Sequence, residues 1–186
     1  MKKVLGFSGS NNSNSINQQL VAAAGSLLSG SQFHLIELRK YDQPVFSSDL
    51  QKEKGIPDKI RELHATILEH DAFIISLPEY NWSVTGLFKN TIDWLSVVEK
   101  NYKIFGNKPV LLLSATPGRG GGKVAMEHGE KIIHAMGGKV TRKFSFPSFH
   151  HHMKGETEEM KNSKDKLMDE LKIAVNEFTL ALNGPQ

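Results

Sequence analysis

Hydrophobic and polar positions follow two periods that alternate along the chain. Short apolar runs typical of buried strands recur near residues 4–7, 33–38, 72–77, 109–114 and 139–144. Apolar residues at helical spacing follow the first four runs, near residues 16–28, 57–68, 86–98 and 122–136, and a charged helix is predicted over 158–182. Alternating strands and helices predict a parallel sheet with helices on both faces. No repeat or linker interrupts this pattern, so we expect a single α/β domain over residues 1–186.

The segment from Ser8 to Asn17 joins the first predicted strand to the first helix and consists mostly of Ser, Asn and Gly. Ser15 and Gln18 have the spacing of a capping box. A helix N-terminus offers N–H groups and the positive end of a dipole to an anion. An ordinary helix-capping turn has a similar composition, because Ser and Asn are favoured there too. Taken alone, the segment is therefore either a phosphate loop or a simple cap.

Two more loops of unusual composition follow the third and fourth predicted strands. Residues 78–83 read Pro-Glu-Tyr-Asn-Trp-Ser, and residues 114–122 are rich in glycine. In a doubly wound sheet of order 2-1-3-4-5, the carboxyl ends of strands one, three and four lie side by side, and ligands bind at that edge. A glycine-rich backbone can approach a flat ligand closely. The three loops together predict a site for a planar heterocycle that carries a terminal phosphate.

Composition excludes several other classes of protein. The chain has no cysteine, which excludes disulfides, thiolate nucleophiles and Cys-ligated metal centres. Its net charge is +3, but Lys and Arg are scattered and do not alternate with aromatic residues, so no nucleic-acid partner is expected. No apolar run has the length of a secretory signal or a membrane span. We expect a cytoplasmic protein without a membrane partner.

Other phosphate-binding and catalytic motifs are missing. Lys123 is followed by Val124, and the glycines before it lack the spacing of a Walker loop. No G-x-G-x-x-G follows the first strand, and the chain has no G-x-S-x-G elbow. These absences disfavour an NTPase, a dinucleotide-binding protein of the G-x-G-x-x-G type and a hydrolase. A mononucleotide site remains.

Two stretches carry a family resemblance. Residues 9–17, GSNNSNSIN, resemble the G-S-L-R-x-x-S-x-N phosphate loop of the NADPH-dependent FMN reductase family, which includes chromate, azo-dye and quinone reductases. Residues 78–94, PEYNWSVTGLFKNTIDW, are similar to that family's P-E-Y-N-x-S-x-P-G-x-L-K-N-A-I-D-W signature. With the glycines at 118–122 and 137–138, the resemblance spans most of residues 3–145. It implies a flavodoxin-like fold with FMN as cofactor and NADPH or NADH as co-substrate.

The resemblance also implies which residues border the cofactor. The phosphate loop would hold the phosphate, and the loops at 78–81 and 114–121 would line the two sides of the isoalloxazine ring. The implied cofactor-binding residues are Ser8, Ser10, Asn12, Ser15, Ile16, Asn17, Pro78, Glu79, Tyr80, Asn81, Ser114, Thr116, Gly118 and Gly121. No catalytic side chain and no metal ligand is expected, because the flavin itself carries the chemistry.

The implied activity is hydride transfer from a reduced nicotinamide through FMN to a small acceptor, by a ping-pong mechanism. Quinones, azo compounds, chromate and free flavin are the candidate acceptors. The alternative is a flavodoxin-like electron carrier. Such carriers are typically acidic and have a Thr-Gly-x-Thr phosphate loop, whereas this chain is basic and lacks that pattern. A domain that has kept the fold and lost the flavin is the third alternative.

The helix predicted over 86–98 bears on assembly. At about 100° per residue, its apolar positions cover roughly 160°, which is wider than the stripe of a helix packed on one core. These positions are Leu87, Phe88, Thr91, Ile92, Trp94, Leu95 and Val98. Part of the face is expected to meet a second subunit, in agreement with the homodimers and homotetramers that the resemblance implies. A deeply buried monomer helix has the same pattern.

Several candidate residues remain open. Three adjacent histidines, His150–His152, point in different directions on any regular element, so we expect a loop near the site mouth rather than a metal site. Arg119 and Lys123 are candidates for the 2′-phosphate of NADPH, although surface Arg and Lys side chains are usually only solvated. Tyr80 and Trp82 either stack on nicotinamide or pack the loop.

The chain departs from the family pattern at two positions. Thr85 stands where the family has proline, and this change is expected to affect only the stiffness of the loop. Asn12 stands where the family has arginine, and no Lys or Arg occurs from Ser8 to Asn17. Neutral donors and the helix dipole would then hold the phosphate without charge-assisted hydrogen bonds. The chain is therefore expected to retain FMN comparatively weakly.

Replacing Asn12 by Arg is expected to tighten FMN binding, because a guanidinium adds the charge-assisted bonds that the loop lacks. Flavin fluorescence titrations at low salt measure the dissociation constants of the original protein and of the Asn12→Arg variant. Equal constants would contradict this expectation.

Overall fold

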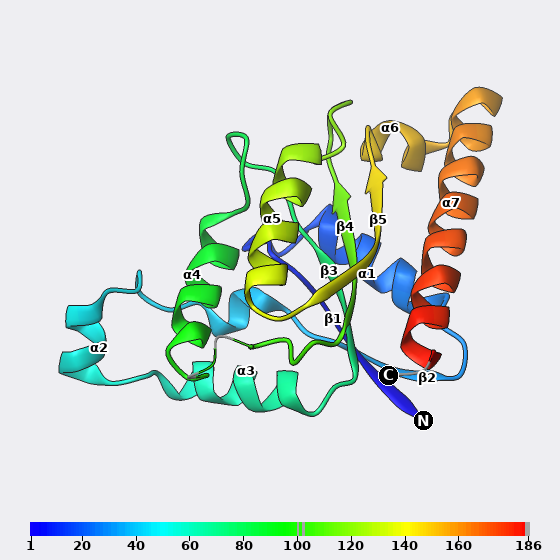
Figure 1. Cartoon of the computed structure of the whole chain (residues 1–186). Coiled ribbons are helices and arrows are strands. Elements are labelled where there is room, and N and C mark those ends of the chain that lie inside the picture. The colour runs from blue at the N-terminus through cyan, green and yellow to red at the C-terminus, as the bar shows by residue number, and fades with distance from the viewer. Residues whose placement is uncertain (100, 102, 185–186) are drawn as a thin grey trace.

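A five-stranded parallel sheet forms the centre of the computed structural model, which describes residues 1–99, 101 and 103–184 (Figure 1). The strands are β1 (Lys2–Ser8), β2 (Ser31–Leu35), β3 (Ala72–Ser76), β4 (Pro109–Ala115) and β5 (Lys139–Phe146). Their order is β2-β1-β3-β4-β5, and every neighbouring pair is parallel. The predicted flavodoxin-like doubly wound sheet of order 2-1-3-4-5 is confirmed.

Helices cover both faces of the sheet. The helical elements are α1 (Ile16–Ser26), the 3₁₀ turn η1 (Leu38–Tyr41), α2 (Ser48–Lys54), α3 (Asp58–Leu68), α4 (Gly86–Ser96), α5 (Lys123–Ala135), α6 (Phe149–Lys154) and α7 (Glu158–Asn183). Of these, α2 has no buried residue and lies away from the sheet (Figure 1). Alternate strand residues face opposite layers, so Leu112 packs with α3, α4 and α5 while Leu113 packs with α1 and α7. Among the described helices, none is both long and apolar enough to cross a bilayer.

The second strand differs from its prediction over 33–38. β2 ends at Leu35, and Leu38 begins η1, where it is buried with the residues of α3 and α4. The N–H of Ile36 still donates to Gly6 O at 2.9 Å before the chain turns away from the sheet. An apolar run indicates that its residues are buried, but not whether they lie in a strand or in another element. The strand predicted from the run was therefore too long at its C-terminal end.

The wide apolar stripe of α4 is covered within one chain. Its six apolar positions from Leu87 to Leu95 are buried, and Trp94 is 1% exposed. Residues after η1 cover the outer part of the stripe. The Trp94 indole donates to Pro44 O at 2.9 Å and meets the Phe46 ring edge-on at 5.1 Å, and Phe46 N–H donates to the Asn90 amide oxygen at 2.8 Å. The inference of a second subunit from this stripe is therefore wrong, because the loop at 42–46 accounts for its width.

The ring of Phe33 lies between two glycines. A Cβ built on Gly6 would lie 2.5 Å from the ring, and a Cβ built on Gly25 would lie 2.1 Å from it. Gly6 lies in β1, Gly25 in α1 and Phe33 in the edge strand β2. The two glycines therefore make room for one aromatic side chain that joins the edge strand to α1.

Replacing Gly25 by Ala is expected to lower the free energy of unfolding by about 1–3 kcal/mol, the usual cost of overpacking a filled site. At an open helix position the same change would stabilise by up to about 1 kcal/mol, so the sign is informative. Urea unfolding measures the effect. In a Phe33→Ala background, where the ring is gone, Gly25→Ala is expected to cost less; an equal cost in both backgrounds would contradict the contact.

Candidate functional site

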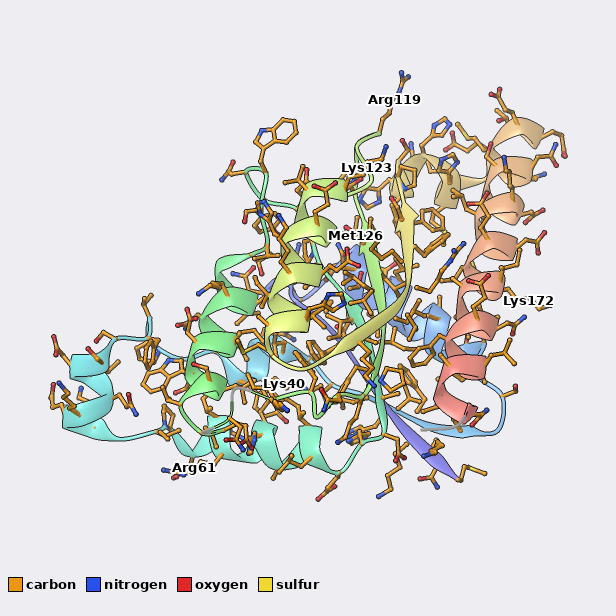
Figure 2. All side chains as sticks on the ribbon, viewed as in Figure 1. Lys40, Arg61, Arg119, Lys123, Met126 and Lys172 are labelled. Carbon is orange, nitrogen blue, oxygen red and sulfur yellow. The ribbon has the colours of Figure 1, made fainter. Side chains whose placement is uncertain are left out.

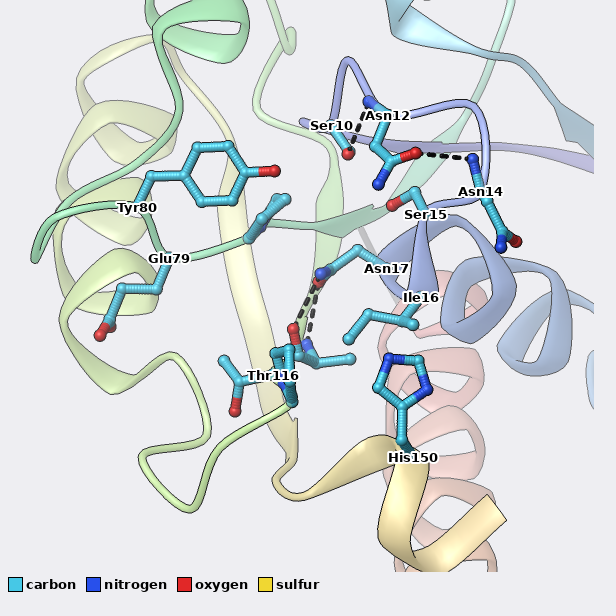
Figure 3. A pocket seen from close by; sticks show the side chains of 13 residues that line it. Ser10, Asn12, Asn14, Ser15, Ile16, Asn17, Glu79, Tyr80, Thr116 and His150 are labelled. Carbon is cyan, nitrogen blue, oxygen red and sulfur yellow. Dashed lines mark hydrogen bonds between the residues drawn. The ribbon is translucent and has the colours of Figure 1, made fainter. Parts of the chain in front are cut away.

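A pocket opens at the carboxyl edge of the sheet, where β1, β3 and β4 end (Figure 3). Its lining comes from the loop before α1, the loop after β3, the loop after β4 and the start of α6. The lining residues are Ser10, Asn12, Asn14, Ser15, Ile16, Asn17, Pro78, Glu79, Tyr80, Ala115, Thr116, Pro117 and His150. The three loops singled out by composition therefore meet at one site.

Hydroxyl groups of the first loop remain available as donors to a ligand. Ser10 Oγ accepts from Asn12 N–H at 3.1 Å, and Ser15 Oγ accepts from Gln18 N–H at 3.2 Å. Both oxygens act as acceptors in these bonds, so each hydroxyl hydrogen can still be donated. Ser10 and Ser15 are buried in the protein, but both border the pocket. The loop thus presents neutral donors to the pocket.

Asn12 shapes the loop through its side chain. Its Oδ1 accepts from Asn14 N–H at 2.9 Å, an Asx-type turn that fixes the course of the backbone before α1 (Figure 3). An arginine at this position would add charge and lose this turn. The structural role of Asn12 was not visible in the sequence, where only the missing charge could be noted.

The N-terminus of α1 faces the pocket. Ser15 is its N-cap, as predicted, but Gln18 does not complete the capping box. Gln18 instead accepts from Ser8 N–H at 3.1 Å and donates to Ile36 O at 2.8 Å, which ties α1 to β1 and to the end of β2. Within the described residues, the N–H groups of Ile16 and Asn17 have no acceptor. Unpartnered N–H groups at a helix N-terminus suit an anion.

Asn17 holds the strand ends in place. Its amide donates to Ala115 O at 2.8 Å and accepts from Ala115 N–H at 2.9 Å. The same oxygen accepts from the Ser76 hydroxyl at 2.7 Å. The side chain is 2% exposed and joins α1 to the ends of β3 and β4. The side chain of Asn17 is therefore engaged with the protein, and its backbone N–H is the group open to a ligand.

A second helix N-terminus at this edge is capped by a carboxylate. Glu79 Oε2 accepts from Val124 N–H at 2.9 Å and from Ala125 N–H at 3.1 Å, in the first turn of α5. In Figure 3 the Glu79 carboxylate is directed away from Asn17. The negative charge offsets the positive end of the α5 dipole. The N-terminus of α1 is therefore the better site for a phosphate, and the loop after β3 lies on the opposite side of the pocket.

The loop after β3 forms a tight hairpin turn. Tyr80 and Ser83 exchange backbone hydrogen bonds of 3.1 and 3.2 Å, and the central residues Asn81 and Trp82 have φ values of 50° and 63°. Positive φ at both central residues is the geometry of a type I′ turn. Asparagine tolerates it, but tryptophan does so only at a cost. Tyr80 lines the pocket, whereas the Trp82 indole is 76% exposed.

The glycine-rich loop after β4 is organised by its own contacts. Thr116 Oγ1 donates to Gly118 O at 2.8 Å and accepts from Gly121 N–H at 3.0 Å. Gly121 has a φ of 66°, and a Cβ there would lie 2.2 Å from the Ser145 hydroxyl. Ser114 Oγ donates to Leu77 O at 2.6 Å beneath the loop. Glycine is needed here for close packing on the strand ends, whereas Thr116 and Pro117 are the members of this loop that border the pocket.

Predicted residues and lining residues overlap in part. Nine of the residues implied by the resemblance line the pocket, and five others lie outside the lining: Ser8, Asn81, Ser114, Gly118 and Gly121. The pocket is also lined by four residues that are not among those implied by the resemblance: Asn14, Ala115, Pro117 and His150. The histidines were expected in a loop near the site mouth, and they lie on the short helix α6 instead. Their position just after β5, which ends at the same sheet edge, is the signal that points to the pocket.

Thr85 connects the phosphate loop to α4. Its hydroxyl donates to Gly9 O, and its oxygen accepts from Phe88 N–H at 3.2 Å as the N-cap of α4. Gly9 N–H donates to Ser76 O at 2.9 Å, so both backbone groups of Gly9 are used. The side chain is 3% exposed. The expectation that Thr85 affects only loop stiffness is therefore wrong, because this hydroxyl bridges two elements of the site.

The site fits a mononucleotide. It combines the N-terminus of α1, whose first N–H groups have no acceptor within the described residues, with two serine hydroxyls, with Tyr80 and with the loop after β4. In a doubly wound sheet of this order, the edge beyond β1 and β3 is where such ligands bind. Fold and site thus define a mononucleotide-binding protein of the flavodoxin-like class. Among the described residues, no cluster of His, Asp or Glu is arranged to hold a metal ion.

The model of the NADPH-dependent FMN reductase family matches residues 2–151. The chain therefore belongs to this family, a family of enzymes, and the resemblance found in the sequence is confirmed. It is 35% identical over 105 residues to the quinone reductase of Escherichia coli K12, covering 56% of this chain and 55% of that protein. It is 35% identical over 127 residues to an NAD(P)H-dependent FMN reductase of Pseudomonas aeruginosa, covering 68% and 66%. The matches thus span between half and two thirds of these curated relatives.

Solved structures agree on the fold. The flavoenzyme NAD(P)H:acceptor oxidoreductase FerB of Paracoccus denitrificans superimposes with a TM-score of 0.69, covering 96% of this chain and 98% of that one at 24% identity. An oxidoreductase of Corynebacterium diphtheriae gives a TM-score of 0.73 at 14% identity, covering 100% and 99%. The likeness therefore extends beyond residue 151 to the last helix.

Replacing Thr85 by Ala is expected to lower the free energy of unfolding by about 1–2 kcal/mol, since both the N-cap of α4 and the bond to Gly9 are lost. Thr85→Ser keeps the hydroxyl and serves as the matched control. Thr85→Pro suits the backbone φ of −68° but leaves Gly9 O without its partner, so we expect an intermediate stability. Urea unfolding compares the variants. An alanine variant as stable as the serine variant would contradict the bridge.

Proposed function

We propose that this protein is an FMN-dependent oxidoreductase that takes hydride from NADPH or NADH and reduces a small acceptor such as a quinone, by a ping-pong mechanism. The observation that carries the proposal is the N-terminus of α1, where the N–H groups of Ile16 and Asn17 have no acceptor within the described residues. It lies beside the Ser10 and Ser15 hydroxyls, at the edge where mononucleotides bind. Membership of the family supplies the identity of the cofactor. The names of the bacterial relatives support the choice of acceptor class.

Each part of the pocket has a separate task in this proposal. The N–H groups of Ile16 and Asn17 and the two serine hydroxyls bind the phosphate, and the loop at 78–81 and Thr116 border the flavin ring. FMN supplies the redox chemistry, by accepting hydride from the nicotinamide and passing electrons to the acceptor. In this proposal the residues that border the ring would fix its orientation. Because Glu79 is engaged with α5, no side-chain acid is assigned a proton-transfer step.

The electron-carrier alternative is disfavoured by charge and by the phosphate loop. The chain has a net charge of +3, whereas an acidic surface would steer a carrier to basic partners.

Some expectations from the sequence remain predictions. Two of these concern Arg119, which extends from the loop after β4, and Lys123, which are candidates for binding the 2′-phosphate of NADPH (Figure 2). The homodimer or homotetramer implied by the resemblance and the cytoplasmic location also remain predictions. The α4 stripe no longer supports assembly, since it is buried within one chain.

Spectroscopy and turnover of the purified protein test the proposed function. Reconstitution with FMN is expected to give a flavin band near about 450 nm, a property of the cofactor, and rapid NADPH oxidation on addition of a quinone. Ser10→Ala is expected to retain less FMN, whereas Ser13→Ala, outside the pocket lining, serves as the control. Flavin without turnover would favour the electron carrier, and failure to bind FMN would favour a domain that has lost it.

A further inference from the structure

The pocket lacks a permanent positive charge for the phosphate. Of the residues that line it, only Glu79, Tyr80 and His150 have ionisable side chains. Glu79 is an anion engaged at the start of α5, and Tyr80 is a neutral phenol donor. His150 is therefore the single lining side chain that can carry a positive charge.

The packing of α6 fixes the position of His150. Ser148 N–H donates to Gly118 O at 2.8 Å, and Phe149 N–H donates to Thr116 O at 3.0 Å, so the loop after β4 holds the start of this helix. The Phe149 side chain is 6% exposed and packs against the ring of Phe146 at 5.2 Å. These contacts are made by the protein alone. His150 therefore lies at the pocket before any ligand enters.

The His150 ring is directed at the first turn of α1. In Figure 3 it points from α6 toward Ile16 and Asn17, the residues whose backbone N–H groups have no acceptor within the described part of the chain. The hydrogen bonds of the described residues do not use either nitrogen of the His150 ring. His152, in contrast, packs its ring against Phe146 at 6.1 Å, and His151 is exposed beside it without lining the pocket. One histidine of the three is thus oriented toward the phosphate end.

We propose that His150 binds the phosphate of FMN by donating a ring N–H to a phosphate oxygen, and so takes the place of the cation missing from the loop at Asn12. The inference rests on the proposed function, because it assumes that the pocket holds FMN. When the imidazole ring is protonated, both partners of its hydrogen bond to phosphate are charged, and the bond is then stronger than one from a neutral hydroxyl. The donor that replaces the family's arginine thus comes from a helix about 140 residues away in sequence, from Asn12 to His150.

Paired titrations with FMN and riboflavin test this role, because riboflavin lacks the phosphate. FMN dissociation constants are measured by flavin fluorescence for the original protein and for His150→Leu, His150→Lys and the control His151→Leu. Leucine has no hydrogen-bond donor, so His150→Leu is expected to weaken FMN binding about tenfold or more, the effect of losing a hydrogen bond to a charged group. Riboflavin binding is expected to change little. His150→Lys, which supplies a cation, and His151→Leu are expected to bind FMN about as well as the original protein.

The outcomes separate this inference from the proposed function. Unchanged FMN binding by His150→Leu overturns the inference while the function stands. An equal loss for FMN and riboflavin also overturns it, because the contact would then be on the ribityl chain or the ring. If the original protein binds no FMN, both fail. Thermal unfolding of each variant shows that a loss of affinity is not a loss of fold.

Discussion

The buried amide of Asn17 is the interaction on which the site depends. It pairs with both backbone groups of Ala115 and accepts from the Ser76 hydroxyl, so a single side chain sets the position of α1 relative to β3 and β4. At 2% exposure these polar groups have no access to bulk water, and breaking one of the bonds would leave its partner unsatisfied. Because α1 begins one residue earlier, the same bonds hold its N-terminal N–H groups at the edge of the pocket.

Two helix N-termini reach this edge, and they differ in the charge of the group that caps them. Glu79 caps α5 with a carboxylate, which offsets the positive end of that helix dipole. α1 is capped only by the neutral Ser15, and its first N–H groups have no acceptor in the described part of the chain. An anion is thereby favoured at α1 and disfavoured at α5. This asymmetry makes the end of the pocket at α1 the one that suits an anion, and Tyr80 borders the pocket from the loop after β3.

Much of this arrangement was predictable. The apolar runs predicted all five strands, and three loops of unusual composition predicted the site edge, because loops at the carboxyl ends of parallel strands converge. The failures have physical causes. Leu38 is buried by helices rather than by the sheet, and the α4 stripe is covered by the loop that contains Phe46. In both cases the spacing of apolar residues shows that they are buried, but not which part of the protein covers them.

The sequence by itself determined the order of elements, the family and the polar composition of the loop before α1, since periodicity and local motifs depend on residues close together in the chain. Only the tertiary structure decided how single side chains are used. Asn17 bonds to strand ends, Thr85 bridges Gly9 and α4, and His150 enters the pocket from a helix after the last strand. Each of these contacts is between residues that are far apart in sequence. They therefore form only when the elements at this edge of the sheet have packed together.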